Sequence, residues 1–172
     1  KEVLEGALNR CAQRAPEWLQ AKVPQEWFRR YGQSDFAGRA AKTQAEKRAQ
    51  AEQIGRDGVQ LLLWLEQDDT PQELRETREI QVLQQVWPQQ YVLAVDGSAA
   101  VQWREKGQLL PAAARIASPH DTEARYSIKG STEWVGYKVH LTETCEPDSP
   151  HFITHVETTI ATEQDVDQVD AI

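Results

Sequence analysis

Four histidines and one cysteine near the end of the chain are the side chains best suited to metal chemistry. They are His120, His140, Cys145, His151 and His155. Imidazole and thiolate groups bind zinc when their spacing brings them to one point, but these spacings match no compact zinc motif. Alternation along an expected strand places His140 on one face beside Lys138. We therefore interpret the histidines as strand-surface residues rather than metal ligands.

Three cations in the same region could bind an anion such as a phosphate. They are Arg125, Lys129 and Lys138. The alternative is ordinary ion pairing with nearby carboxylates. These carboxylates are Asp121, Glu123 and Glu133. Both interpretations of the three cations remain open. The SPHD sequence that ends at Asp121 is typical of a turn that Asp121 caps, and we favour this role of Asp121 over metal binding.

The composition is that of a folded protein. Of the 172 residues, 40% are hydrophobic and 27% are charged, and six Trp, four Tyr and three Phe supply large apolar side chains for a core. The longest apolar run, Leu61–Leu65, is far shorter than a membrane span, and no signal-peptide pattern opens the chain. With two cysteines far apart in sequence, we expect a soluble cytoplasmic protein.

Charge is distributed unevenly along the sequence. The net charge is -8, which argues against a general nucleic-acid binder. Residues 1–64 hold 11 Lys and Arg against 8 Asp and Glu, a net of +3, whereas residues 65–172 hold 8 against 19, a net of -11. The acidic part could hold metal ions or simply keep the protein in solution.

The two ends of the sequence suggest a piece of a longer protein. The sequence starts at Lys1 and contains no methionine. Its last residues, DVDQVDAI, begin a helical pattern that stops within about two turns. We expect an internal fragment.

Residues 1–88 are predicted to be helical. Apolar residues recur at helical spacing in the opening segment, at Val3, Leu4, Ala7, Leu8 and Cys11. A helix rich in Ala, Gln and Glu is expected over residues 34–53, and GRDG at 55–58 is expected to interrupt it. Thr70, Pro71 and Glu73 have the form of a capping box that starts a helix running to about Val86.

Residues 89–172 are predicted to contain strands. Tyr91–Val95 and Ser98–Arg104 flank the dipeptide Asp96-Gly97 as in a hairpin, and Pro111–Pro119 reads as a connecting segment. Trp134–Glu143 and Phe152–Thr159 alternate in polarity and are expected to pair antiparallel across the turn-rich residues 145–150. The predicted fold class is therefore α+β, with a helical first half.

Several segments carry a resemblance to one protein family. The most specific are SPHDTEARYS at 118–127, GYKVHLTET at 136–144 and ITHVETT at 153–159, with weaker support from IGRDG at 54–58 and VWPQQY at 86–91. Together they resemble bacterial insertion-sequence transposases of the DDE superfamily. The resemblance implies that residues 1–88 are insertion-like and that residues 89–172 form part of a ribonuclease H-like mixed α/β domain.

The resemblance also implies a reaction. In such transposases three acidic residues bind two Mg²⁺ or Mn²⁺ ions, which activate a water or a 3′-hydroxyl for attack on a DNA phosphodiester. The partner would be DNA at the ends of the insertion sequence, with Arg125, Lys129 and Lys138 as the candidate DNA-binding residues, and a homo-oligomer is compatible with this. Residues 136–144 and 153–159 would be the second and third strands of the sheet, and Asp165 would begin the next helix. The metal-binding trio would then lie outside this chain, which we expect to be inactive and metal-free in isolation.

Two further interpretations stay open. Asp96 follows the apolar run VLAV, which resembles the position of the first metal-binding Asp in related transposases, although a hairpin turn explains it better. As for function, the chain could instead be a helical protein-interaction module without catalysis, or belong to a ribonuclease H-like nuclease that has no part in transposition.

Overall fold

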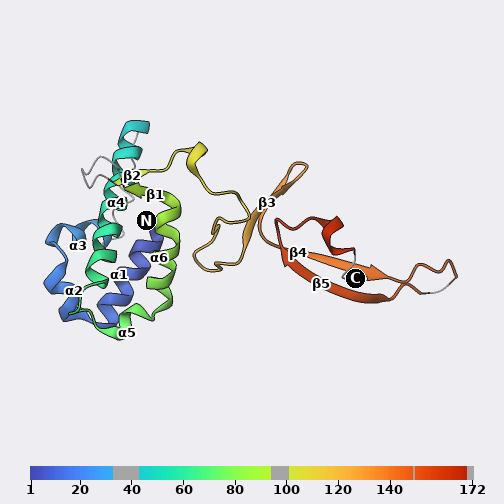
Figure 1. Cartoon of the computed structure of the whole chain (residues 1–172), viewed down its shortest axis with the longest axis horizontal. Helices are drawn as coiled ribbons and strands as arrows, with labels where there is room; N and C mark the ends of the chain where they lie inside the picture. The colour runs from blue at the N-terminus through green and yellow to red at the C-terminus, as the bar shows by residue number, and fades with distance from the viewer. Residues whose placement is uncertain (33–42, 94–100, 149, 170–172) are drawn as a thin grey trace. The chain divides into compact units, whose positions relative to one another are not determined.

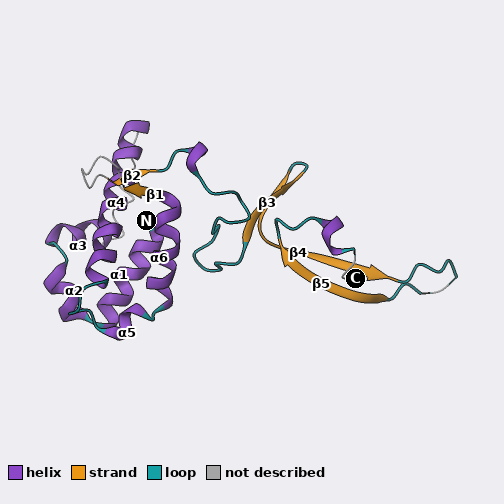
Figure 2. Cartoon of the chain, viewed as in Figure 1, coloured by secondary structure: helices purple, strands orange, loops and turns teal. Residues whose placement is uncertain are grey.

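The computed structural model describes residues 1–32, 43–93, 101–148 and 150–169 (Figure 1). They fall into two units, Lys1–Leu109 and Leu110–Ile172. Every α-helix of the described residues lies in the first unit, and a three-stranded sheet lies in the second (Figure 2). The mixture of helix and strand, with a helical first half, confirms the α+β prediction at this level.

Helices α1 (Glu2–Arg14) and α6 (Arg78–Gln90) pack against each other in the first unit (Figure 1). Both have an apolar stripe at helical spacing, which drives their association. The fully buried side chains of the stripes include Leu4 and Cys11 in α1 and Ile80 and Leu83 in α6. Burial raises the pKa of the Cys11 thiol to about 11, so this residue is a core side chain and a poor nucleophile.

Two short helices extend this core. α2 (Pro16–Lys22) and α3 (Gln25–Tyr31) contribute Leu19 and Trp27 to it. The Trp27 ring lies 5.3 Å from that of Trp64 and meets Tyr31 edge-on at 5.8 Å. Such tilted and edge-on geometries are those that aromatic pairs prefer. Trp27 and Trp64 are therefore packing residues of the helical unit.

Helix α4 (Gln44–Leu65) corrects the expectation of an interruption at residues 55–58, because it runs through both glycines without a break. A Cβ on Gly55 would lie 2.5 Å from the Tyr91 ring, and one on Gly58 would lie 2.1 Å from the Trp87 ring. The Trp87 indole also donates a hydrogen bond to the Gly55 carbonyl at 3.0 Å. These glycines are required for close packing and not for a turn.

The start of the last helical segment also differs from the prediction. Thr70 does not cap a helix, because its hydroxyl donates to the carbonyl of Trp64 at 2.7 Å. The expected single helix is divided into α5 (Gln72–Arg75) and α6, and the N-cap position of α6 is Thr77. A capping box does form elsewhere, at the start of α4 between Thr43 and Glu46.

Strands β1 (Tyr91–Leu93) and β2 (Val101–Trp103) confirm the predicted antiparallel pairing, while the predicted turn at Asp96-Gly97 lies outside the described residues. Leu93 is paired with Val101. A two-residue turn at 96–97 would instead pair Leu93 with Ala100, so the observed register differs by one residue from the one that this turn requires. Val101 is buried and β2 contacts α4, so the hairpin belongs to the helical unit. The sequence placed it with the second half, because alternation shows that a strand exists but not what the strand packs against.

The second unit is a sheet of order β3-β4-β5, antiparallel throughout. Its strands are β3 (Arg125–Lys129), β4 (Thr132–Glu143) and β5 (Ile153–Ile160). The predicted pairing of residues 134–143 with 152–159 is confirmed by β4 and β5, while β3 was not predicted. Two residues connect β3 to β4, and Gly130 takes a φ of 61°, which favours glycine.

The contact between Trp87 and α4 leads to a stability prediction. Gly58→Ala should destabilise the protein by about 1–3 kcal/mol, because the added methyl group overlaps a buried indole ring. Gly6→Ala is the matched control. Gly6 lies in α1 with nothing within 4 Å of its added Cβ, so this change should stabilise by up to about 1 kcal/mol through helix propensity. Urea unfolding followed by tryptophan fluorescence measures both, and equal stabilisation by the two changes would contradict the observed packing.

Candidate functional site on the three-stranded sheet

The two faces of the sheet carry different side chains. Register and alternation place an apolar row on one face, with Tyr126, Ile128, Val135, Tyr137, Val139, Leu141 and Val156. The opposite face carries Arg125, Lys129, Lys138, His140 and Thr159. All three cations that the sequence singled out thus share one face.

Burial on the two faces is the reverse of the usual pattern. Val139 is 61% exposed, whereas His140 is 9% exposed. The expectation that the histidines are strand-surface residues is therefore wrong for His140, because the chain that follows β5 folds over it. His155 is exposed on β5, as expected, whereas His120 and His151 are exposed but lie outside the strands.

The segment that covers the polar face begins at the end of β5. Ala161 is fully buried, and its N–H donates to the Gly136 carbonyl at 3.3 Å. The Lys138 ammonium donates to the Glu163 carbonyl, and a short 3₁₀ helix follows at Asp165–Gln168. A helical turn thus begins at Asp165, where the resemblance implied the start of a helix, and residues 170–172 lie outside the described residues.

Asp165 brings together side chains from two strands. Its Oδ2 lies 3.3 Å from the Lys129 Nζ, and its Oδ1 lies 3.6 Å from the Lys138 Nζ and 3.9 Å from the His140 Nδ1. The hydrogen bond from Lys129, aided by the charges of both lysines, lowers the pKa of this carboxyl. We call these four residues the Asp165 cluster. The cluster is a place where two cations and one imidazole converge on a single anionic group.

His140 links the cluster to β5. Its Nε2 lies 3.0 Å from the Thr159 Oγ1. If Nε2 accepts the hydroxyl proton, the Nδ1 carries hydrogen and faces Asp165, whereas a protonated ring donates from both nitrogens. The orientation of His140 is therefore set by Thr159, and its Nδ1 faces the Asp165 carboxylate.

Arg125 has a different role from the lysines. Its guanidinium donates to the carbonyls of Ala113 at 2.7 Å, Thr122 at 2.6 Å and Ala124 at 3.2 Å. It therefore fastens the segment that precedes β3. Of the three predicted cations, the structure brings Lys129 and Lys138 together and engages Arg125 with the backbone.

Asp121 caps a turn, as the sequence predicted. Its Oδ1 accepts the backbone N–H groups of Glu123 at 3.0 Å and Ala124 at 3.1 Å. The Tyr137 hydroxyl donates to its Oδ2 at 2.9 Å, and this bond raises the pKa of the tyrosine. Asp121 thus connects the turn to β4. The acidic partner of the two lysines is instead Asp165, which no local sequence signal indicates because it lies 36 residues beyond Lys129.

Other chemistry-bearing residues stay apart. Among the residues that the structure describes, no group of three or more His, Cys, Asp or Glu side chains is placed to hold a metal ion. His151 faces Glu143 at 3.6 Å and His155 faces Glu157 at 3.8 Å, both as exposed pairs. Asp96, the alternative catalytic residue, lies outside the described residues.

A buried carboxylate in the helical unit is structural. Asp57 is 4% exposed and is fully engaged by α3 and α4. It accepts hydrogen bonds from the Arg30 guanidinium, from the Tyr31 hydroxyl at 2.6 Å and from the Gln53 amide at 2.9 Å. A carboxylate whose charge and lone pairs are satisfied in this way joins helices and is not free for chemistry.

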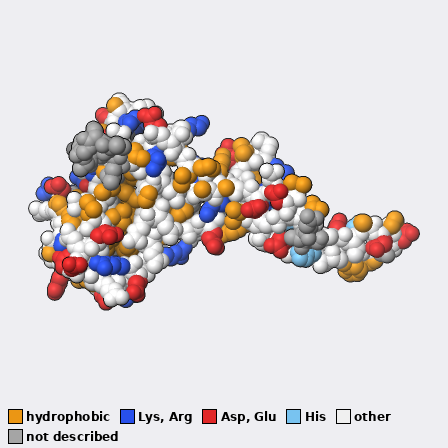
Figure 3. All heavy atoms as spheres, viewed as in Figure 1, with side chains coloured by type: hydrophobic (Ala, Val, Ile, Leu, Met, Phe, Trp, Pro, Cys, Tyr) orange, Lys and Arg blue, Asp and Glu red, His pale blue; other side chains and the backbone are white. Residues whose placement is uncertain are grey.

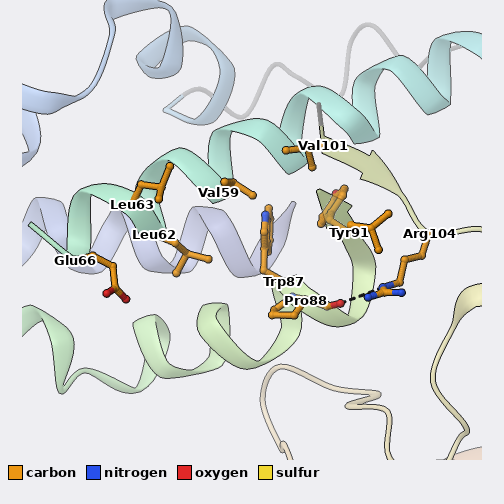
Figure 4. A pocket seen from close by; sticks show the side chains of 10 residues that line it. Val59, Leu62, Leu63, Glu66, Trp87, Pro88, Tyr91, Val101 and Arg104 are labelled. Atoms are coloured by element: carbon orange, nitrogen blue, oxygen red, sulfur yellow. Dashed lines mark hydrogen bonds between the residues drawn. The ribbon is translucent and has the colours of Figure 1, made fainter. Parts of the chain in front are cut away.

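The helical unit also has an apolar groove of about 680 Å³ between α4, α6 and the hairpin (Figure 4). Trp87 stands between the two helices, and Val59, Leu62 and Tyr91 complete much of the wall (Figure 4). Arg104 lies at the edge, where it donates to the Pro88 carbonyl at 3.0 Å. Such a groove suits an apolar group rather than a phosphate.

The face of the helical unit that Figure 3 presents carries charged side chains of both signs. On the face that Figure 3 presents, Lys and Arg alternate with Asp and Glu. The modest positive balance of residues 1–64 is therefore not gathered there into a basic surface. The Asp165 cluster remains the more specific candidate for binding an anion.

The chain matches no family model, no curated protein and no solved structure with which it was compared. In the described part of the chain, none of the helices has both the length and the apolar character that crossing a membrane requires.

The different roles of Arg125 and Lys129 can be tested by hydrogen exchange. Arg125→Ala should speed amide exchange in residues 113–124, because three backbone carbonyls lose a charged donor. Lys129→Ala removes the same charge from a side chain that is 77% exposed and should leave these amides unchanged. Equal exchange in the two variants would show that Arg125 does not hold this segment.

Proposed function

We propose that this chain is part of a bacterial insertion-sequence transposase of the DDE type. In the whole protein, β3, β4 and β5 would belong to a ribonuclease H-like catalytic domain that cleaves DNA and transfers strands with Mg²⁺ or Mn²⁺. The observation that supports this most is the pairing of two of the three segments that resemble such transposases most specifically. Residues 136–144 and 153–159 lie in the adjacent antiparallel strands β4 and β5.

Electrostatics support a role for the polar face in holding DNA. A two-metal site must keep a polyanion beside metal-binding carboxylates, so nearby cations are needed to offset the repulsion. Lys129 and Lys138 come from different strands and converge on one carboxylate. Phosphate contacts of this kind set the position of DNA without reading its sequence. A guanidinium has five N–H donors, so Arg125 can hold backbone carbonyls and still offer a donor to a phosphate.

A protein-interaction role is the second candidate. It is favoured by the apolar groove of the helical unit, where Leu63 is 56% exposed. This role needs no contact with DNA and no metal. Binding of a protein partner that is blocked by Leu63→Asp, together with no binding of DNA, would favour it over the transposase proposal.

Salt-dependent binding tests the DNA contacts. In the whole protein, Lys129→Ala and Lys138→Ala should each weaken binding similarly on terminal-repeat and random DNA, and should lower the salt slope by about one unit. Lys47→Ala, on the exposed surface of α4, is the control for loss of one positive charge and should have a smaller effect. Filter binding or fluorescence anisotropy across a salt series gives both quantities. Parental affinity and slope in both lysine variants would remove the DNA assignment.

Metal-dependent cleavage tests the position of the active site. We expect the purified chain alone to leave DNA intact with Mg²⁺ or Mn²⁺, because the resemblance puts the metal-binding carboxylates elsewhere in the protein. The whole protein should cut at the ends of its element, and terminal inverted repeats should flank its gene. If the chain alone cleaves DNA and Asp96→Ala abolishes this cleavage, Asp96 is instead the first metal ligand.

A further inference from the structure

The Asp165 cluster has the arrangement of an anion site that is already filled. The two oxygens of one carboxylate face separate cations, Lys129 at Oδ2 and Lys138 at Oδ1. His140 adds a third donor group beside Oδ1. A phosphate offers the same kind of charged oxygens to the same donors, and lysine and imidazolium groups are suited to both.

We propose that the Asp165 carboxylate occupies the position that a phosphate group of bound DNA takes on this face, so that DNA must displace Asp165 from Lys129, Lys138 and His140. This inference rests on the proposed function for the identity of the phosphate source. It adds a binding role for His140 and a competing role for Asp165.

The interactions of Asp165 are weak enough to exchange. Its side chain is 60% exposed and that of Lys129 is 77% exposed, and solvated ion pairs of this kind contribute little. The 3₁₀ helix that carries Asp165 has no buried residue, and both Val166 within it and Val169 directly after it are exposed. Little packing therefore holds the carboxylate in place.

The strand positions of the donors, in contrast, do not depend on Asp165. Lys138 is held by the Glu163 carbonyl and is 20% exposed, and His140 is held by Thr159. Lys129 is at the end of β3, where it pairs with Thr132 of β4. The sheet thus keeps the donors on one face without the carboxylate. A phosphate arriving from solvent reaches the cluster on the side where Lys129 and Asp165 are open.

A carboxylate that competes with phosphate has a measurable signature. Asp165→Asn keeps the shape of the side chain and removes its charge, so affinity for a phosphate should rise about three- to tenfold as the competition ends. Asp167→Asn is the matched control, because Asp167 lies on the same 3₁₀ helix and the change removes the same charge. It should raise affinity less than about twofold, through long-range electrostatics alone.

The experiment uses the full chain with two probes, inorganic pyrophosphate and a duplex DNA of about two helical turns. Amide NMR spectra recorded during each titration report both the binding constant and whether the variant is folded. We expect Asp165→Asn to bind both probes more tightly than wild type and than Asp167→Asn. Adding Lys129→Ala to Asp165→Asn should remove most of the gain, since the anion then loses its most accessible donor.

The outcomes separate this inference from the proposed function. A gain with pyrophosphate but not with DNA keeps the anion site and removes DNA as its ligand. Equal gains for Asp165→Asn and Asp167→Asn would mean that only total charge matters, which overturns the inference. Weaker binding or no binding of both probes by a folded Asp165→Asn variant also overturns it, because Asp165 would then support the site rather than fill it.

Discussion

The antiparallel pairing of β4 with both of its neighbours is the constraint on which the candidate site depends. Side chains alternate between the faces of a strand, so a shift of one residue in either pairing would move its partners to the opposite face. In the observed register, Lys129 of β3, Lys138 and His140 of β4, and Thr159 of β5 share one face. The short turn at Gly130 fixes the first pairing. The Asp165 cluster therefore depends first on the backbone hydrogen bonds that set the register, and its side-chain interactions follow from that register.

The same register also determines which side chains of the sheet are exposed and which are covered. One face of the sheet is apolar yet largely exposed, while Lys138 and His140 on the polar face are covered by the segment from Ala161 to Asp165. Covering a lysine and a histidine costs solvation, which hydrogen bonds and a nearby opposite charge must offset. The Glu163 carbonyl, Thr159 and the Asp165 carboxylate supply these partners. An external phosphate would supply the same compensation, which is the physical link between the fold of this unit and its proposed ligand.

In the helical unit, patterns of local origin were predictable and contacts between distant segments were not. The apolar stripe of α1 and the hairpin signature around residues 91–103 follow from periodicity, and both are confirmed. Gly55 and Gly58 have the local signature of a break, but Trp87 and Tyr91 pack directly on them, so helix α4 continues. Thr70 has the local signature of a cap, but the Trp64 carbonyl takes its hydroxyl. For the glycines the deciding partners are distant in sequence, with Trp87 lying 32 residues after Gly55, whereas for Thr70 the partner is the end of the preceding helix.

The sequence by itself determined the helical first half, the strands β4 and β5 and their pairing, and the turn at Asp121. These follow from periodicity and residue chemistry, which act over a few residues. Only the tertiary structure decided that His140 is buried, that Arg125 donates hydrogen bonds to backbone carbonyls, and that Asp165 is the anion between the two lysines. Asp165 lies 36 residues from Lys129, and their contact arises from the path of the chain around β4 and β5, which no local pattern encodes.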